Sequence, residues 1–235
     1  MYLTDAMRDA SALLLSGDAA LWQIVWVSLK TSIAGLVLAA PLALLAGYLI
    51  AARDFSGRRV VVWLTQAALS VPTVLIGLLL YLMLSRRGLL GGLHWLFSQP
   101  GLVAGQALIT LPLLAALTLS AVQACDPRLA ETAITLGASG WRVMLTVLHE
   151  ARFGVMAAII NGFGRAISEV GCAMMVGGNI AGETRTITTA IALETSKGEF
   201  AQGIALGIVL IVIALIINAA LMLVQGDPRA ARAIA

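Results

Sequence analysis

Five long stretches of this sequence contain almost no charged side chains, which restricts the chain to folds that a lipid bilayer can solvate. The hydrocarbon core of a bilayer is crossed by about 20 helical residues. The stretches cover residues 21–52, 60–84, 101–124, 154–178 and 203–224. Only 11% of all residues are charged, against about 25% in soluble domains. We therefore predict an all-α integral membrane protein, with residues 1–235 forming a single transmembrane domain.

Two further segments leave the number of spans open between five and six. Residues 1–17 alternate apolar and polar side chains, which is typical of a short helix lying at the membrane surface. Residues 89–97 are apolar but too short to span, and fit a re-entrant loop. If either segment crosses the membrane, the chain has six spans.

The basic residues predict which side of the membrane each loop faces, because cytoplasmic loops carry an excess of Lys and Arg. With five spans, one side carries eight arginines and the other carries five basic residues. We assign the first side to the cytoplasm, which leaves the N-terminus outside and the C-terminus inside. The eight arginines are Arg53, Arg58, Arg59, Arg128, Arg142, Arg152, Arg229 and Arg232.

The longest predicted cytoplasmic segment covers residues 126–152. Asp126 followed by Pro127 is typical of an N-cap and the first residue of a helix. Gly137 is expected to end that helix with a positive φ, and Ser139 to cap a second one. An exposed apolar elbow indicates a covering partner, although a loop folded on its own bundle is the alternative. The elbow carries Ala133, Leu136, Ala138 and Trp141.

The same segment resembles the EAA-x3-G signature of ABC importer permeases, through Glu131-Thr132-Ala133 and Gly137. It departs from the family pattern where His149-Glu150 replaces Leu-Pro. The resemblance implies a type I importer transmembrane domain whose cytoplasmic segment docks in a groove on an ATPase. Glu131 would contact the groove's rim, and Ala133 and Leu136 would pack inside it. The implied coupling residues are Glu131, Thr132, Ala133, Leu136, Gly137, Ala138 and Trp141.

Two opposite charges, Arg165 and Glu169, lie four residues apart near the middle of the fourth span. A charge at that depth costs about 2.5–3.5 kcal/mol on insertion scales, and an i,i+4 pair offsets much of this. Two interpretations remain open. The pair is a salt bridge that holds the span, or Arg165 contacts an anion on the translocation path and exchanges Glu169 for it. Asn161 and Ser168, within a turn of Arg165, would then add hydrogen-bond donors.

In the external segment after the fourth span, apolar residues recur at helical spacing. This pattern predicts a helix that lies in the plane of the membrane surface. Three runs resemble the oxyanion-importing branch of the family, and the tungstate type more than the molybdate type. These runs are Ser168-Glu169-Val170-Gly171, Gly177-Gly178-Asn179-Ile180 and Thr186-Ile187-Thr188-Thr189-Ala190-Ile191. Hydroxyls of this segment would join the path, whose predicted residues are Asn161, Arg165, Ser168, Glu169, Thr186 and Thr188.

The sequence contains no Gly-x-x-x-x-Gly-Lys-Ser/Thr loop, so ATP and Mg²⁺ are expected on a separate ATPase. We expect no catalytic residue, metal site or cofactor in this chain. The resemblance implies a bacterial-type inner membrane location and a tungstate permease, with molybdate as an alternative. The implied partners are a second copy, two cytoplasmic ATPase subunits, an extracytoplasmic oxyanion-binding protein and lipid, without nucleic acid.

Two alternatives of other classes find little support in the sequence. A secondary transporter would tend to show inverted repeats with paired broken helices, which we do not find in five unequal spans. A membrane-embedded enzyme would need a motif such as HExxH or GxSxG, and neither occurs.

Overall fold

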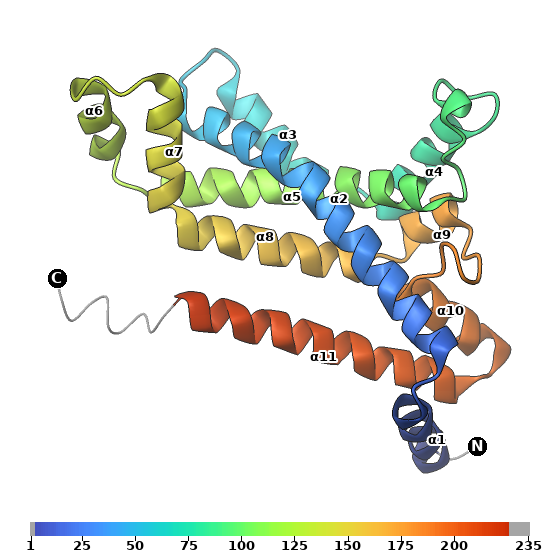
Figure 1. Ribbon diagram of the computed structural model, residues 1–235. Coiled ribbons are helices and arrows are strands. Elements are labelled where there is room, and N and C mark those ends of the chain that lie inside the picture. Colours follow the sequence, from blue (N-terminus) through green and yellow to red (C-terminus); the bar gives the residue numbers. More distant parts are fainter. Residues whose placement is uncertain (1–2, 226–235) are drawn as a thin grey trace.

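The structure, a computed structural model, describes residues 3–225, and every regular element in that part of the chain is helical (Figure 1). The prediction of an all-α chain is confirmed. Arg229 and Arg232, which contributed to the predicted orientation, lie outside the described residues. The first six elements are α1 (Leu3–Ser16), α2 (Ala19–Ala52), α3 (Arg58–Ala68), α4 (Thr73–Leu84), η1 (Gly91–Leu93) and α5 (Gln99–Gln123). The others are α6 (Arg128–Thr135), α7 (Gly140–Glu150), α8 (Arg152–Ile167), α9 (Gly171–Gly177), α10 (Ile187–Lys197) and α11 (Phe200–Gln225).

Three of the expected spans are single helices. α2, α5 and α11 are each long and apolar enough to cross a membrane, and they match the first, third and fifth stretches of the sequence. Two bent helix pairs, α3 with α4 and α7 with α8, raise the number of candidate spans to five, and the second pair overlaps the fourth stretch only through α8. Pro41 and Pro112 lie inside α2 and α5 without ending either helix.

The second expected span, residues 60–84, is formed by two helices separated by a break and not by one continuous helix. α3 and α4 meet at an angle of 96°. Pro72 disfavours a helical conformation for Val71, and its own carbonyl accepts the first backbone hydrogen bond of α4, from Leu75 at 3.0 Å. The chain therefore changes direction across residues 69–72.

The fourth expected span is also interrupted, which corrects the prediction of one helix over residues 154–178. α8 ends at Ile167 and α9 begins at Gly171. The carboxylate of Glu169 accepts the backbone N–H of Cys172 at 3.0 Å, so it caps the first turn of α9. Arg165 therefore lies in the last turn of α8 and Glu169 in the break, so the two charges do not share one continuous helix.

The two short segments do not meet the length needed to span. α1 has 14 residues, and Ala10 is buried in the cluster that also contains Leu206 of α11. The segment at residues 89–97 forms only the three-residue η1 and turns, with His94 and Phe97 in the left-handed region. The structure therefore favours five spans over six.

α2 and α5 cross closely through a stripe of small side chains spaced four residues apart, which allows two helix backbones to approach. The stripe consists of Gly35, Ala39, Ala43 and Gly47, all buried. A Cβ at Gly47 would lie 2.7 Å from the carbonyl oxygen of Ala115.

We expect Gly47→Ala to destabilise the protein by about 1–3 kcal/mol, because the added methyl group overpacks this crossing. A fall in the melting temperature of the detergent-solubilised protein would measure the effect. Gly207→Ala is the matched control, since a Cβ at Gly207 would meet nothing within 4 Å. Equal melting temperatures for the two variants would contradict the prediction.

The second helices of the two broken spans pack against each other, with α4 beside α9 (Figure 1). A Cβ at Gly77 would lie 2.7 Å from the Cα of Cys172, and one at Gly171 would lie 2.6 Å from the side chain of Val74. These glycines allow α4 and α9 to pack closely. The contact brings the two helix breaks to one region of the bundle.

Candidate functional site

The predicted cytoplasmic segment forms a helix–turn–helix, α6 and α7, at one end of the molecule (Figure 1). α6 begins at Arg128, one residue later than expected, and the Asp126 carboxylate accepts the Arg128 backbone N–H at 2.9 Å. Gly137 has a φ of +80°, as predicted for the residue that ends α6. Ser139 precedes α7, but its side chain makes no capping hydrogen bond. The chain turns by 76° between α7 and α8, although His149-Glu150 replaces the Leu-Pro of the signature.

The coupling residues divide into an exposed group and an inward group. Leu136 is 82% exposed, and Trp141 is also largely exposed. Ala133 and Ala138 instead pack against the buried cluster that includes Val143. Ala133 is therefore not part of the exposed apolar surface on which the sequence placed it. Glu131 and Thr132 are exposed on α6.

The sequence reasoning missed Ile134, which is exposed on α6 beside the turn. The sequence could have indicated its exposure, because Ile134 is an apolar residue between the polar Thr132 and Thr135 in a segment predicted to lie in water. The exposed apolar set is therefore Ile134, Leu136 and Trp141, and from here on the name elbow refers to these three residues in place of the four predicted ones.

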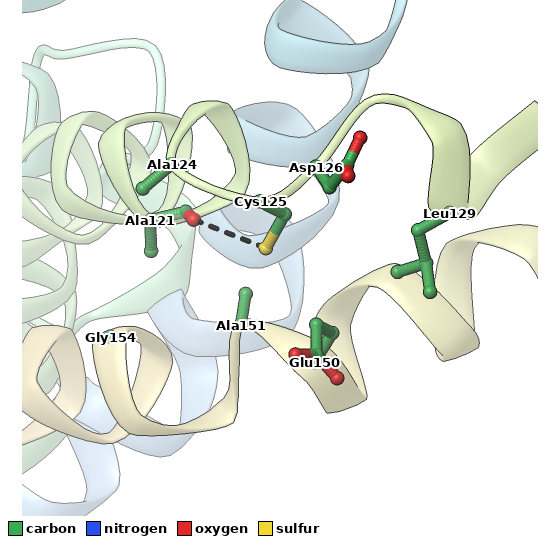
Figure 2. A pocket seen from close by; sticks show the side chains of 8 residues that line it. All are labelled: Ala121, Ala124, Cys125, Asp126, Leu129, Glu150, Ala151 and Gly154. Carbon is green, nitrogen blue, oxygen red and sulfur yellow. Dashed lines mark hydrogen bonds between the residues drawn. The ribbon is translucent and has the colours of Figure 1, made fainter. Parts of the chain in front are cut away.

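A cavity of about 380 Å³ separates the start of α6 from the end of α5 and the junction between α7 and α8 (Figure 2). Cys125 lies in its wall, 3.5 Å from the carbonyl oxygen of Ala121. Burial raises the pKa of the Cys125 thiol, and the nearby Glu150 carboxylate raises it further. The thiol is therefore protonated at neutral pH, which makes it a poor nucleophile.

The break between α8 and α9 is held together by Glu169, whose side chain is only 2% exposed. The expected ion pair is present, with Arg165 Nη1 lying 3.0 Å from Glu169 Oε2. The other carboxylate oxygen accepts the Cys172 N–H. Thr188 of α10 donates its hydroxyl to the Glu169 backbone carbonyl at 2.7 Å. Glu169 thus joins α8, α9 and α10.

The two threonines predicted to lie on the path are buried. Thr186 precedes α10 and forms a capping box with Thr189, while Thr188 braces Glu169. The helix predicted for this segment is present as α10, at the opposite end of the molecule from α6 (Figure 1). Thr186 and Thr188 therefore hold the break and α10 in place and do not line an open surface.

Three of the other predicted path residues meet at one open hollow, whereas Glu169 does not line it. Asn161 and Arg165 of α8, and Ser168 directly after it, line a space of about 350 Å³ together with Asn218 of α11. Arg165 also lines a smaller cavity of about 70 Å³ beside the break between α3 and α4. Asn218 was missed, although it is the single polar side chain in residues 203–224.

Comparison with known proteins decides the family. The profile of the family described as binding-protein-dependent transport system inner membrane component matches residues 23–232. The chain belongs to this family. This permease is 40% identical to a probable anion ABC transporter permease of Haloferax volcanii, over 83% of its own length and 87% of the relative. It is 37% identical to the tungstate uptake system permease TupB of Campylobacter jejuni, over 92% and 91% of the two chains.

The fold is also found in a solved structure. A chain of a bacterial alginate ABC transporter, crystallised with an alginate-bound periplasmic protein, matches this permease with a TM-score of 0.72. The two are 18% identical, and the match covers 94% of this chain and 87% of that one. This permease is therefore a multi-pass membrane protein with the type I ABC importer fold. Family membership favours a transport subunit over the secondary transporter and the membrane enzyme.

Proposed function

We propose that this permease imports tungstate across the inner membrane, together with an extracytoplasmic binding protein and cytoplasmic ABC ATPases. The observation that carries this proposal is the similarity to a tungstate uptake permease over nearly the whole of both chains. The cationic hollow at Arg165 suits a dianion. Molybdate is a tetrahedral dianion of nearly equal size, so we assign the choice between the two to the binding protein.

The exposure of Arg165 supports assembly of two copies around the translocation path. Its side chain is 40% exposed on a helix expected to lie within the membrane. Facing lipid, such a charge costs about 2.5–3.5 kcal/mol on insertion scales. A second copy that covers the hollow removes this cost and encloses an aqueous path. Each chain then supplies one transmembrane domain, residues 1–235, and one cytoplasmic docking segment.

Docking of an ATPase on the elbow would explain why a segment in water exposes such large apolar side chains. Ile134, Leu136 and Trp141 would enter the groove, and Gly137 would allow the tight turn between them. Two copies would hold two ATPase subunits, which bind the ATP and Mg²⁺. In this arrangement Glu131 and Thr132 contact the rim of the groove. Ala133 and Ala138 fix the elbow from behind, as their inward packing suggests.

The course of the helices supports the predicted orientation. α11 runs from the end that holds α1 and α10 towards the end that holds α6 and α7 (Figure 1). If the elbow meets a cytoplasmic ATPase, α11 ends in the cytoplasm and α1 lies at the outer surface. The C-terminus then follows α11 on the cytoplasmic side.

The test is uptake into proteoliposomes that contain the permease, its ATPase and the binding protein. We expect ATP-dependent accumulation of tungstate, weaker accumulation of molybdate and almost none of sulfate. Omission of the binding protein should reduce uptake to background. Equal indifference to all three anions would refute the proposal.

A further inference from the structure

We infer that each copy of this permease holds a transit site for a tetrahedral oxyanion in the hollow between α8 and α11. In this site Arg165 and Asn218 bind the anion, and Glu169 positions Arg165 without facing the anion. The inference rests on the proposed function, which supplies the anion. It adds a residue of α11 to the path, and it gives Glu169 a positioning role in place of an exchange with substrate.

The ion pair presents only its positive partner to the hollow. Arg165 is 40% exposed and Glu169 is 2% exposed. A guanidinium has five N–H groups, and in the described part of the chain one side-chain hydrogen bond occupies them, to Glu169. Both Glu169 oxygens already accept hydrogen bonds, from Arg165 and from the Cys172 backbone. An anion in the hollow therefore meets a cation with free donors, while the carboxylate is turned away.

Two amides add neutral donors to this cation. Asn161 donates one N–H to the Ala157 carbonyl, and Asn218 donates one to the Ala214 carbonyl, each at 2.8 Å. A side-chain amide carries two N–H groups, so each keeps one for an anion. The Ser168 hydroxyl differs, because its single proton is donated to the Gly164 carbonyl. Ser168 thus shapes the wall and is not the donor that the sequence predicted.

Only the face of α11 that carries Asn218 is suited to an anion, because the hollow on another face is apolar. A second hollow, between α2, α8 and α11, has only aliphatic and aromatic walls, including Ile213 and Ile216. Asn218 lines the polar hollow. Polar side chains inside membranes are costly, and where they occur they mark transport paths. α11 therefore has one face suited to an anion and another suited to hydrocarbon.

Thiol labelling tests the electrostatic part of the inference. The variant Asn218→Cys is treated, in the assembled transporter, with an anionic sulfonate and a cationic ammonium methanethiosulfonate reagent. We expect the anionic reagent to react about tenfold faster, and the preference to disappear when Arg165→Gln is added. Tungstate should slow the reaction. Ile216→Cys is the matched control, because its thiol lies on the apolar face of the same helix.

Uptake measurements test whether the site is used in transport. We expect Arg165→Gln to reduce tungstate uptake about tenfold or more, and Asn218→Leu to reduce it several-fold. Lys30→Gln is the control for loss of a cation, since Lys30 lines a separate hollow beside Gln99 and should leave uptake nearly unchanged. The double variant Arg165→Gln/Glu169→Gln removes the site without leaving a buried charge unpaired, in case Arg165→Gln fails to fold.

The outcomes separate this inference from the proposed function. If the wild type imports tungstate and the double variant imports it equally well, the transit site is wrong and the proposed function stands. If the wild type imports none of the anions but the Asn218→Cys thiol keeps its preference and is protected by tungstate, the site stands and the proposed function fails. An Asn218→Cys thiol that reacts with neither reagent, or equally with both, overturns the site.

Discussion

Replacement of Leu136 by aspartate is expected to detach the ATPase subunits from this permease and to reduce ATP-dependent uptake to background. Leu136 is 82% exposed at the elbow, and a carboxylate in its place would have to be buried unpaired in an apolar groove. Losses at such central contacts reach about 2–4 kcal/mol or more, which is enough to break a complex at ordinary protein concentrations. Co-purification of the ATPase with the tagged permease measures the effect.

The matched control is Leu89→Asp. Leu89 is 92% exposed and lies near η1, away from the elbow, so its replacement adds the same charge without touching the proposed docking surface. This variant should retain the ATPase and transport normally. The docking assignment is wrong if Leu136→Asp co-purifies with as much ATPase as the wild type does.

Replacement of Glu169 by leucine is expected to destabilise the break between α8 and α9. The change removes the partner of Arg165 and the acceptor for the Cys172 N–H. Loss of one partner of a buried pair costs about 3–5 kcal/mol, and the partial exposure of Arg165 places this case near the lower end. The melting temperature of the solubilised transporter should fall by several degrees or more, with a lower yield of folded protein.

A double-mutant comparison separates the charge from the cap. Glu169→Gln leaves an amide oxygen that can still accept the Cys172 N–H, and Arg165→Gln/Glu169→Gln also removes the unpaired charge. Stability should therefore rise in the order Glu169→Leu, Glu169→Gln, double variant. If all three variants have the same melting temperature as the wild type, Glu169 does not hold the break.

Hydropathy predicted the three spans that are single helices, α2, α5 and α11, but it could not predict that the other two expected spans are broken. Pro41 and Pro112 remain inside helices, whereas the helix ends before Pro72. The difference comes from tertiary packing, because α4 turns to meet α9 through Gly77 and Gly171. A count of apolar residues contains no information about such contacts.

The site residues show the same division between local and tertiary signals. The positive φ of Gly137 followed from a local helix-ending pattern, and the Arg165–Glu169 pair followed from its spacing. The inward direction of Ala133 depends on how α6 packs against the bundle. Asn218 joins Arg165 only because α11 lies beside α8. Sequence spacing does not reveal that neighbour.

The close packing of α4 against α9 has a mechanical consequence. A continuous helix transmits a push along its whole axis, but α8 ends at Ile167, where its ladder of backbone hydrogen bonds stops. A displacement that enters at the elbow and travels along α7 and α8 is therefore expected to reach α9 as a rotation about Glu169. Because α4 packs closely against α9 and is joined to α3 by a break of its own, α4 and α9 are expected to rotate together as one rigid unit.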